Sequence, residues 1–229
     1  MRYIFLIILS TFIINKADAQ IYEVGIFADG SNFIGDVGAT DYISPNQPAF
    51  GIVARWNRSP RHSFRASLIF SDLKGVDGES DDPRRKQRGY QFDTSILEIS
   101  AGMEFTFLDF DLHSSGIKGT PYLYSGISLA NHDNYYFTPT GEYTSEGTSS
   151  WAVGIPMALG YKTNIAYHLV LAAEIGARYT FSDELDGSVP DSVDREVFSF
   201  GNTNNTDWYM FTGITLTYTF GRRPCYCNF

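Results

Sequence analysis

Residues 151–161 alternate strictly between large apolar and small side chains, and this alternation constrains the fold more than any other feature. A period of two residues is typical of a β-strand whose two faces differ. The bulky face has an aromatic residue at each end, as in a strand whose outer side contacts lipid between two headgroup layers. The small face holds only alanine, glycine and proline. The bulky face consists of Trp151, Val153, Ile155, Met157, Leu159 and Tyr161.

The N-terminus has the features of a secretory signal peptide. Arg2 precedes an apolar stretch over residues 3–14, and a small-x-small cleavage sequence ends at Ala19. The apolar stretch is too short to span a bilayer as a helix. We therefore predict three segments: a signal peptide over 1–19, an outer-membrane β-barrel over 20–220 and a periplasmic tail over 221–229.

The composition supports an exported all-β protein and argues against nucleic acid as a partner. The whole chain has 17 basic and 26 acidic residues, and cleavage removes Arg2, Lys16 and Asp18, which leaves a formal net charge of −10. A nucleic-acid-binding domain would be basic. Aromatic residues make up 16% of the chain, which also holds 21 glycines, as in a protein rich in strands and turns.

Seven further segments alternate in the same way, which gives eight strands in total. The segment near residues 122–130 is ambiguous, because Leu123, Ile127 and Leu129 compete with Tyr122 and Tyr124 for the outer face. We predict an eight-stranded antiparallel transmembrane β-barrel of the outer membrane. The other segments begin near Tyr22, Phe50, Phe64, Leu97, Leu169 and Met210.

The second face of these strands carries charges interleaved with small residues. It is too small and too charged to form the continuous solvent shell of a soluble sandwich, so it is predicted to face a lumen. Closure of the barrel removes sheet edges that lipid could not satisfy, and eight strands leave a lumen filled by side chains. Because the charges nearly balance, we predict a buried salt-bridge network rather than a channel. Its members are Glu23, Arg55, Arg65, Glu98, Glu104, Glu174 and Arg178. At Pro156, which cannot donate to the ladder, we expect a bulge or a local break.

Short and long connections alternate, as they do between periplasmic turns and extracellular loops. Residues 57–61 and 162–167 are short, and 108–120 is of intermediate length on the same side. This order places both termini in the periplasm. The long connections are residues 30–48, 71–89, 131–149 and 182–207.

Three long connections contain motifs with two interpretations. Gly35 and Gly38 flank Asp36 as in an anion nest, but no P-loop Lys-Ser/Thr follows, so we interpret the segment as a structural turn. The carboxylates of 71–89 precede a basic run, and the two halves pair with each other or contact lipopolysaccharide phosphates. The acidic connection 182–207 does not match an EF-hand, and we expect a solvated loop rather than a Ca²⁺ site.

A catalytic or metal-binding role finds little support. The best candidate is a hydrolase at one rim, with His132 and Asp133 beside Ser149 or Ser150. The G-x-S-x-G sequence of a nucleophile elbow is absent. No pair of histidines has metal-ligand spacing. We therefore predict no catalytic, metal-binding or cofactor-binding residues and no enzymatic activity.

Cys225 and Cys227, the two cysteines of the chain, lie in the predicted tail. The periplasm is oxidising, so free thiols are unusual there. A disulfide between them would close a very small, strained ring. Three interpretations remain open: a local disulfide, two unpaired thiols, or a disulfide to a partner protein.

Three segments resemble the PorG-like outer-membrane barrels of Bacteroidetes. They are residues 22–38, the sequence Pro45-Asn-Gln-Pro-Ala-Phe-Gly51 and the sequence Trp56-Asn-Arg-Ser-Pro-Arg-His62. The resemblance extends through the barrel pattern to the cysteine-bearing tail. It implies a component of the type IX secretion system that associates with the periplasmic ring of PorK and PorN, and in some bacteria with gliding motility.

Residues and resemblance together predict a non-catalytic outer-membrane anchor. Its exterior contacts membrane lipid and lipopolysaccharide, and its periplasmic turns and tail bind the ring of secretion proteins. The alternative is a small OmpA-like barrel with a structural or adhesive role through its surface loops. The predicted contact residues are Arg222, Arg223, Cys225 and Cys227.

Overall fold

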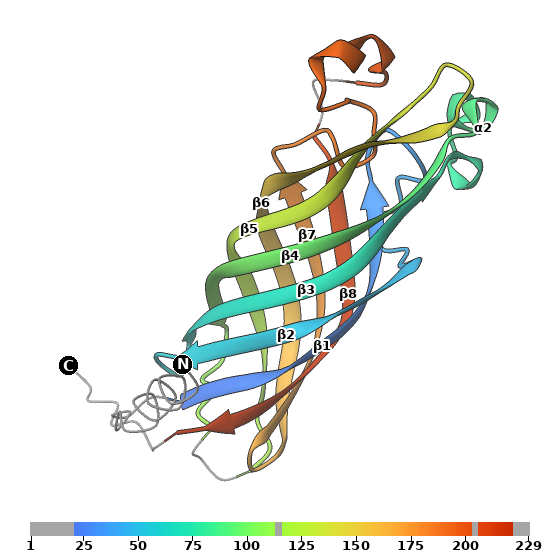
Figure 1. Cartoon of the computed structure of the whole chain (residues 1–229). Coiled ribbons are helices and arrows are strands. Elements are labelled where there is room, and N and C mark those ends of the chain that lie inside the picture. Colours follow the sequence, from blue (N-terminus) through green and yellow to red (C-terminus); the bar gives the residue numbers. More distant parts are fainter. Residues whose placement is uncertain (1–20, 113–115, 203–205, 222–229) are drawn as a thin grey trace, which may run out of the picture.

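The computed structural model describes residues 21–112, 116–202 and 206–221. Eight antiparallel strands form a closed barrel in which each strand pairs with its neighbours in sequence and β1 pairs with β8 (Figure 1). This confirms the predicted fold. The predicted signal peptide and the four tail residues named above lie outside the described residues. The strands are β1 (Ile21–Ile34), β2 (Gln47–Asn57), β3 (His62–Val76), β4 (Gln91–Thr106), β5 (Gly119–Phe137), β6 (Tyr143–Ala166), β7 (Leu169–Thr180) and β8 (Trp208–Phe220).

The outer wall of the barrel is an apolar belt with aromatic residues at its ends. On β6, Trp151 is 53% exposed, Leu159 58% and Tyr161 55%. The ten residue steps from Trp151 to Tyr161 cover about 33 Å along the strand, or about 23 Å across the membrane at a tilt of about 45°. That height matches the apolar band of outer-membrane barrels, about 25 Å. Among the described residues, no helix is long and apolar enough to cross a membrane.

The structure resolves the ambiguity of the fifth strand. Tyr122 and Tyr124 are buried and face the lumen, whereas Leu123, Ile127 and Leu129 are exposed on the outer wall. The tyrosine rings find room inside because small residues lie beside them. Tyr122 is directly opposite Gly160, where a Cβ atom would come within 2.4 Å of the tyrosine ring.

Several strands extend farther than the apolar alternation indicates. The connection predicted over 131–149 is wrong: β5 and β6 continue as a hairpin joined by residues 138–142, and the predicted turn 162–167 is reduced to residues 167–168. Above the belt a strand no longer needs an apolar outer face, so the loss of alternation does not mark its end. The β5–β6 register shifts between Asp133 and Tyr135.

Pro156 causes a local break rather than a bulge. The β5–β6 pairing passes from Ser125↔Met157 to Ser128↔Gly154 in unchanged register, and Pro156 keeps its place opposite Arg178 on β7. On the β6–β7 side the register shifts elsewhere, between Asn164 and Ala166.

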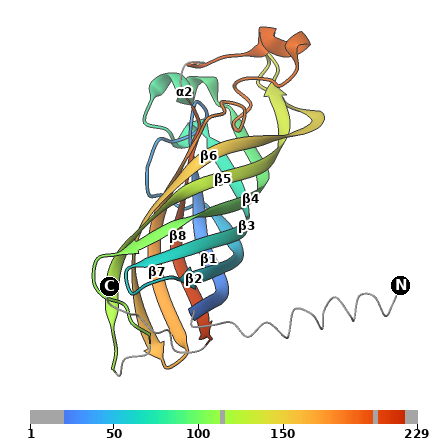
Figure 2. The ribbon, with the colours of Figure 1, turned by 90° about the vertical axis from the view of Figure 1, so that its left-hand side faces the viewer.

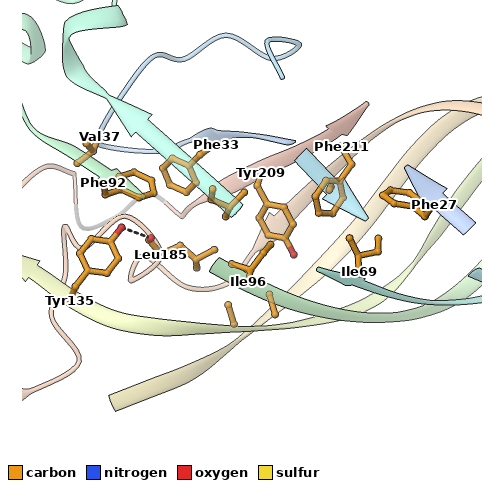
Figure 3. Close-up of a cluster of buried hydrophobic side chains, with 14 of the residues drawn as sticks. Phe27, Phe33, Val37, Ile69, Phe92, Ile96, Tyr135, Leu185, Tyr209 and Phe211 are labelled. Atoms are coloured by element: carbon orange, nitrogen blue, oxygen red, sulfur yellow. Dashed lines mark hydrogen bonds between the residues drawn. The ribbon is translucent and has the colours of Figure 1, made fainter. Parts of the chain in front are cut away.

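The lumen has an apolar half that the sequence analysis did not anticipate. Phe27, Ile69 and Phe211 lie near the middle of the lumen. The apolar side chains continue from there toward one end of the barrel, as far as Phe92 and Tyr135 (Figure 3). The predicted inner face of charges interleaved with small residues therefore describes only the other half of the lumen. These side chains occupy inward positions of the same alternation, so a core of ordinary protein type fills this half.

The end of the barrel next to the apolar half is closed by structured connections. The loop between β3 and β4 contains η1 (Asp77–Glu79) and α2 (Pro83–Arg88), and the loop between β7 and β8 contains η2 (Val193–Phe198). Both loops lie at one end of the barrel, opposite the short turns (Figure 2). We call this end the mouth.

Candidate functional site

The half of the lumen away from the mouth is filled by ion pairs in layers. In the first layer, the Arg55 Nε atom donates to Glu104 Oε2 at 2.9 Å, and Arg55 Nη1 lies 3.4 Å from Glu23 Oε2. Lys162 Nζ donates to the other oxygen of Glu104. Glu23 also accepts from Thr217 and Asn57, each at 2.8 Å. All four charged side chains are essentially inaccessible to solvent.

Two further layers follow toward the mouth. Arg65 donates two hydrogen bonds to Glu174, at 2.7 and 2.8 Å, and the hydroxyl of Tyr122 donates to the same carboxylate. In the next layer Arg178 Nε lies 3.2 Å from Glu98 Oε2, which also accepts from the Tyr209 hydroxyl at 2.7 Å.

The structure thus brings all seven predicted lumen residues into ion pairs and adds two ionisable groups that the sequence analysis missed. Lys162 belongs to the first layer, and Asp29 is a further acidic side chain on the lumen side, 9% exposed. Both were assigned to strand ends or connections. Continued alternation from Tyr161 would have placed Lys162 inside, so the signal was present. The four paired basic groups match four glutamates, and Asp29 lies outside these pairs.

At the mouth, the bend over residues 35–38 is an anion nest that the protein fills itself. The backbone N–H groups of Asp36 and Val37 donate to Asp186 Oδ2 at 2.7 and 3.1 Å. The N–H of Gly38, whose φ is 97°, donates to Asp77 Oδ1 at 2.9 Å. The nest joins three loops, so its role is structural.

The connection between β3 and β4 is held to the same bend. Its acidic and basic halves pair in part, because Arg88 Nε lies 2.7 Å from Asp77 Oδ2. Asp82 caps α2 by accepting from the N–H of Arg84 at 2.8 Å. Arg85 donates to the carbonyl oxygens of residues 35 and 38, both at 2.8 Å. These contacts fix the loop over the mouth.

The connection between β7 and β8 plugs the barrel, so the expectation of a wholly solvated acidic loop is wrong. Residues 185–188 are buried, and the Tyr135 hydroxyl donates to the Leu185 carbonyl oxygen at 2.8 Å (Figure 3). Asp207 accepts from the N–H of Leu185 at 3.0 Å. The side chain of Leu185 joins the apolar cluster of the lumen. Within the described residues, no group of carboxylates, histidines or cysteines is arranged to hold a metal ion.

The plug contains carboxylates whose charges are poorly compensated. Burial raises the pKa of Asp183 to about 7, and the neighbouring charges of Asp186 and Asp36 add to the rise. Burial and the charges of Asp186 and Asp183 raise the pKa of Asp207 well above its ordinary value. Burial also raises the pKa of Asp186. Each of these carboxyl groups therefore keeps its proton to a higher pH in the closed plug than in the free chain.

We predict that the plug loosens as the pH rises. Each raised pKa stabilises the closed loop fully below the pKa of the free carboxyl, about 4, and this stabilisation is lost as the pH passes through the raised value. Amide hydrogen exchange of Leu185 and Ser188, corrected for the chemical exchange rate, should accelerate between pH 5 and pH 8. Asp207→Asn should reduce the acceleration, and Asp191→Asn, at an exposed site of the same loop, should leave it unchanged. Equal corrected rates at both pH values would contradict the prediction.

The structure does not assemble the hydrolase arrangement. His132 is 1% exposed and faces the lumen, whereas Asp133 is exposed on the opposite face of the same strand. Ser150 lies across from His132, but its Oγ atom accepts from Asn134 Nδ2 at 2.8 Å. Ser149 is exposed. A nucleophile, a base and an orienting carboxylate are therefore not in contact.

Fold and lumen together define the class of the eight-stranded outer-membrane β-barrels. Neisserial surface protein A is 13% identical over 89% of this chain and 100% of its own, with a TM-score of 0.50, and this likeness shows the fold. Ail, the attachment invasion locus protein of Yersinia pestis, is 12% identical over 88% of this chain and 99% of its own, with a TM-score of 0.44. A major outer membrane protein of Thermus thermophilus is 14% identical over 88% of this chain and 100% of its own, with a TM-score of 0.43.

The chain belongs to the family described as Domain of unknown function (DUF6089), which matches residues 2–229. No curated protein matches it in sequence.

Proposed function

We propose that this chain is a non-catalytic anchor of the outer membrane whose partners bind at the ends of the barrel. The observation that carries the proposal is the closed lumen. Paired charges fill one half, an apolar core fills the other, and a buried loop covers the mouth. A filled lumen leaves no path for a solute, so the interior serves stability and the surfaces serve function. The apolar belt faces membrane lipid, and exposed Arg84 and Lys86 of α2 are suited to lipopolysaccharide phosphates.

We place the end opposite the mouth in the periplasm. Tyr22 at the start of β1 pairs with Phe220 at the end of β8, so the described chain begins and ends at that end. The turns at 58–61 and 167–168 lie there as well. Short periplasmic turns and longer extracellular loops are the rule for outer-membrane barrels.

We further propose a role in the type IX secretion system, where the barrel would anchor the PorK/PorN ring. The support is the resemblance of residues 22–38, 45–51 and 56–62 to PorG-like barrels. In this fold the three segments form β1 with the nest, the start of β2 and the β2–β3 turn. The tail that follows β8, with Arg222, Arg223, Cys225 and Cys227, is the proposed contact.

The tail proposal is tested by affinity purification of the solubilised barrel from envelopes. The full chain should recover ring proteins, and a chain lacking residues 222–229 should lose them together with secretion. A variant with Cys225→Ser and Cys227→Ser tests whether a disulfide holds the ring proteins. The matched variant, with Arg222→Ala and Arg223→Ala, tests whether a charge contact holds them. A band of higher mass that depends on the cysteines should appear only without reductant. Unchanged ring recovery and secretion after the deletion would exclude the tail as the contact.

A small OmpA-like barrel with a structural or adhesive role is the second candidate. The observation that favours it is the extension of two hairpins, β3–β4 and β5–β6, beyond the apolar belt. If this candidate holds, tail deletion leaves secretion intact, and shortening the β5–β6 hairpin at residues 138–142 alters surface attachment.

A further inference from the structure

Above the apolar belt, the barrel wall divides into two arms with a hollow between them. β3 and β4 pair as far as Val76↔Gln91, but β4 pairs with β5 only from Ile96↔His132 onward. Residues 91–95 of β4 and 133–137 of β5 therefore belong to separate hairpins. The hollow has a volume of about 430 Å³. We call it the arm cleft and define it by Lys74, Gln91, Phe92, Asp93 and Tyr143.

Two aromatic side chains form the apolar part of the arm cleft. The Tyr143 ring stacks on Tyr135, with 4.6 Å between centroids and 29° between planes, yet Tyr143 remains 42% exposed. Phe92 is only 3% exposed and packs against Phe33 and Tyr135. Because buried neighbours hold Tyr143 on one side, it presents an ordered aromatic surface to a ligand at little entropic cost.

The remaining side chains of the arm cleft are polar and differ in kind. Lys74 lies directly opposite Asp93 in the β3–β4 register, and Gln91 lies two residues from Asp93 on the same outer face. Neither Lys74 nor Asp93 forms an ion pair with any residue that the structure describes. An ammonium, a carboxylate and an amide supply both hydrogen-bond donors and acceptors. Their formal charges cancel, which favours a neutral ligand over an anion.

We propose that the arm cleft binds a neutral saccharide unit. The C–H face of a sugar ring packs on an aromatic side chain, while its hydroxyl groups donate to a carboxylate and exchange hydrogen bonds with an amide. Tyr143 supplies the first contact, and Asp93 and Gln91 supply the second. The volume lies within the range of small-ligand sites. This inference goes beyond the anchor role and does not depend on the tail.

The height of the arm cleft indicates where the saccharide comes from. Phe70 and Leu97, a directly opposed pair, belong to the apolar belt, and Lys74 lies four residues farther along β3. Four residues correspond to about 13 Å along the strand and to about 9 Å along the membrane normal at a tilt of about 45°. With the mouth outside the cell, as proposed above, this is the level of the sugars of the outer leaflet. The membrane's own lipopolysaccharide and a free glycan share the same ring chemistry.

Saturation-transfer NMR with the full chain in detergent tests the proposal. One set of probes is the neutral oligosaccharides released from the lipopolysaccharide of the producing strain, and the second is maltotriose, cellotriose and triacetylchitotriose. We expect binding to at least one set, weakened roughly tenfold or more by Tyr143→Ala. Asp93→Asn should weaken it through loss of an acceptor charge. Tyr143→Phe should preserve it, because the ring remains.

Two controls keep the outcome decisive. Tyr167→Ala removes a tyrosine that is 70% exposed at the other end of the barrel and should leave binding unchanged. Tyr143→Ala could disturb the packing of Tyr135, whereas Asp93 is exposed, so Asp93→Asn tests the site independently. Heat-shift electrophoresis reports whether each variant is folded. Binding confined to the first set assigns the lipid source, and binding to the second assigns a free glycan. The proposal is overturned if neither set binds at millimolar concentration, or if Tyr143→Ala and Asp93→Asn bind as the native chain does.

Discussion

Replacing Glu174 with alanine is expected to destabilise the barrel by about 3–5 kcal/mol. Glu174 accepts both hydrogen bonds of the Arg65 guanidinium and the hydrogen bond of the Tyr122 hydroxyl. Its loss leaves Arg65 charged and without its partner in a region closed to solvent. The free energy of unfolding is measured by urea titration of the barrel in lipid vesicles, with tryptophan fluorescence as the signal.

The matched control removes both charges at once. Arg65→Met combined with Glu174→Leu eliminates the unpaired cation, and we expect it to recover most of the stability lost in Glu174→Ala. Exposed Asp109, in the connection between β4 and β5, pairs with exposed Arg61 in the β2–β3 turn, and Asp109→Ala should cost at most about 1 kcal/mol. A loss below about 1 kcal/mol for Glu174→Ala would show that water or a mobile partner reaches Arg65.

Replacing Met157 with arginine is expected to cost about 2–4 kcal/mol. Met157 lies near the middle of the β6 alternation and is 41% exposed on the outer wall. If that wall contacts hydrocarbon, the guanidinium enters the bilayer near its midplane. The same vesicle titration measures the change in the free energy of unfolding.

Depth is the variable that distinguishes lipid from other surroundings. Tyr167→Arg places the same charge at a 70% exposed position in the β6–β7 turn, where the cost should be about 0–1 kcal/mol. Equal costs at the two positions would contradict a lipid-facing wall. The difference in unfolding free energy between Met157→Arg and Tyr167→Arg should be larger in vesicles than in detergent micelles.

Much of the barrel wall could be predicted from sequence because two environments act on alternate residues. Lipid selects large apolar side chains such as Leu159 on one side, while the half of the lumen away from the mouth selects small or paired groups such as Glu104 on the other. The same reasoning missed where strands end. Beyond the belt, Tyr143 and its neighbours keep extended backbone without apolar alternation, because hydrogen bonds across the hairpin persist in water.

The mouth could not be predicted because its contacts are distant in sequence. Asp186 reaches the N–H groups of residues 36 and 37 across about 150 positions, and neither partner carries a local pattern that specifies the other. The acidic composition of 182–207 indicated exposure, yet Leu185 within it completes the apolar cluster. The arm cleft likewise arises from the point where β4 and β5 separate, a property of register rather than of composition.

The closed lumen is the central claim of this account, and planar bilayer conductance tests it most directly. Ions would have to pass the paired charges around Arg55 and Arg65, the apolar cluster around Phe211 and the plug at Leu185. We predict that purified barrels, inserted at neutral pH and verified as folded by heat-shift electrophoresis, produce no conductance steps above the bare bilayer. Stable, ohmic single-channel steps from the folded protein would contradict the account.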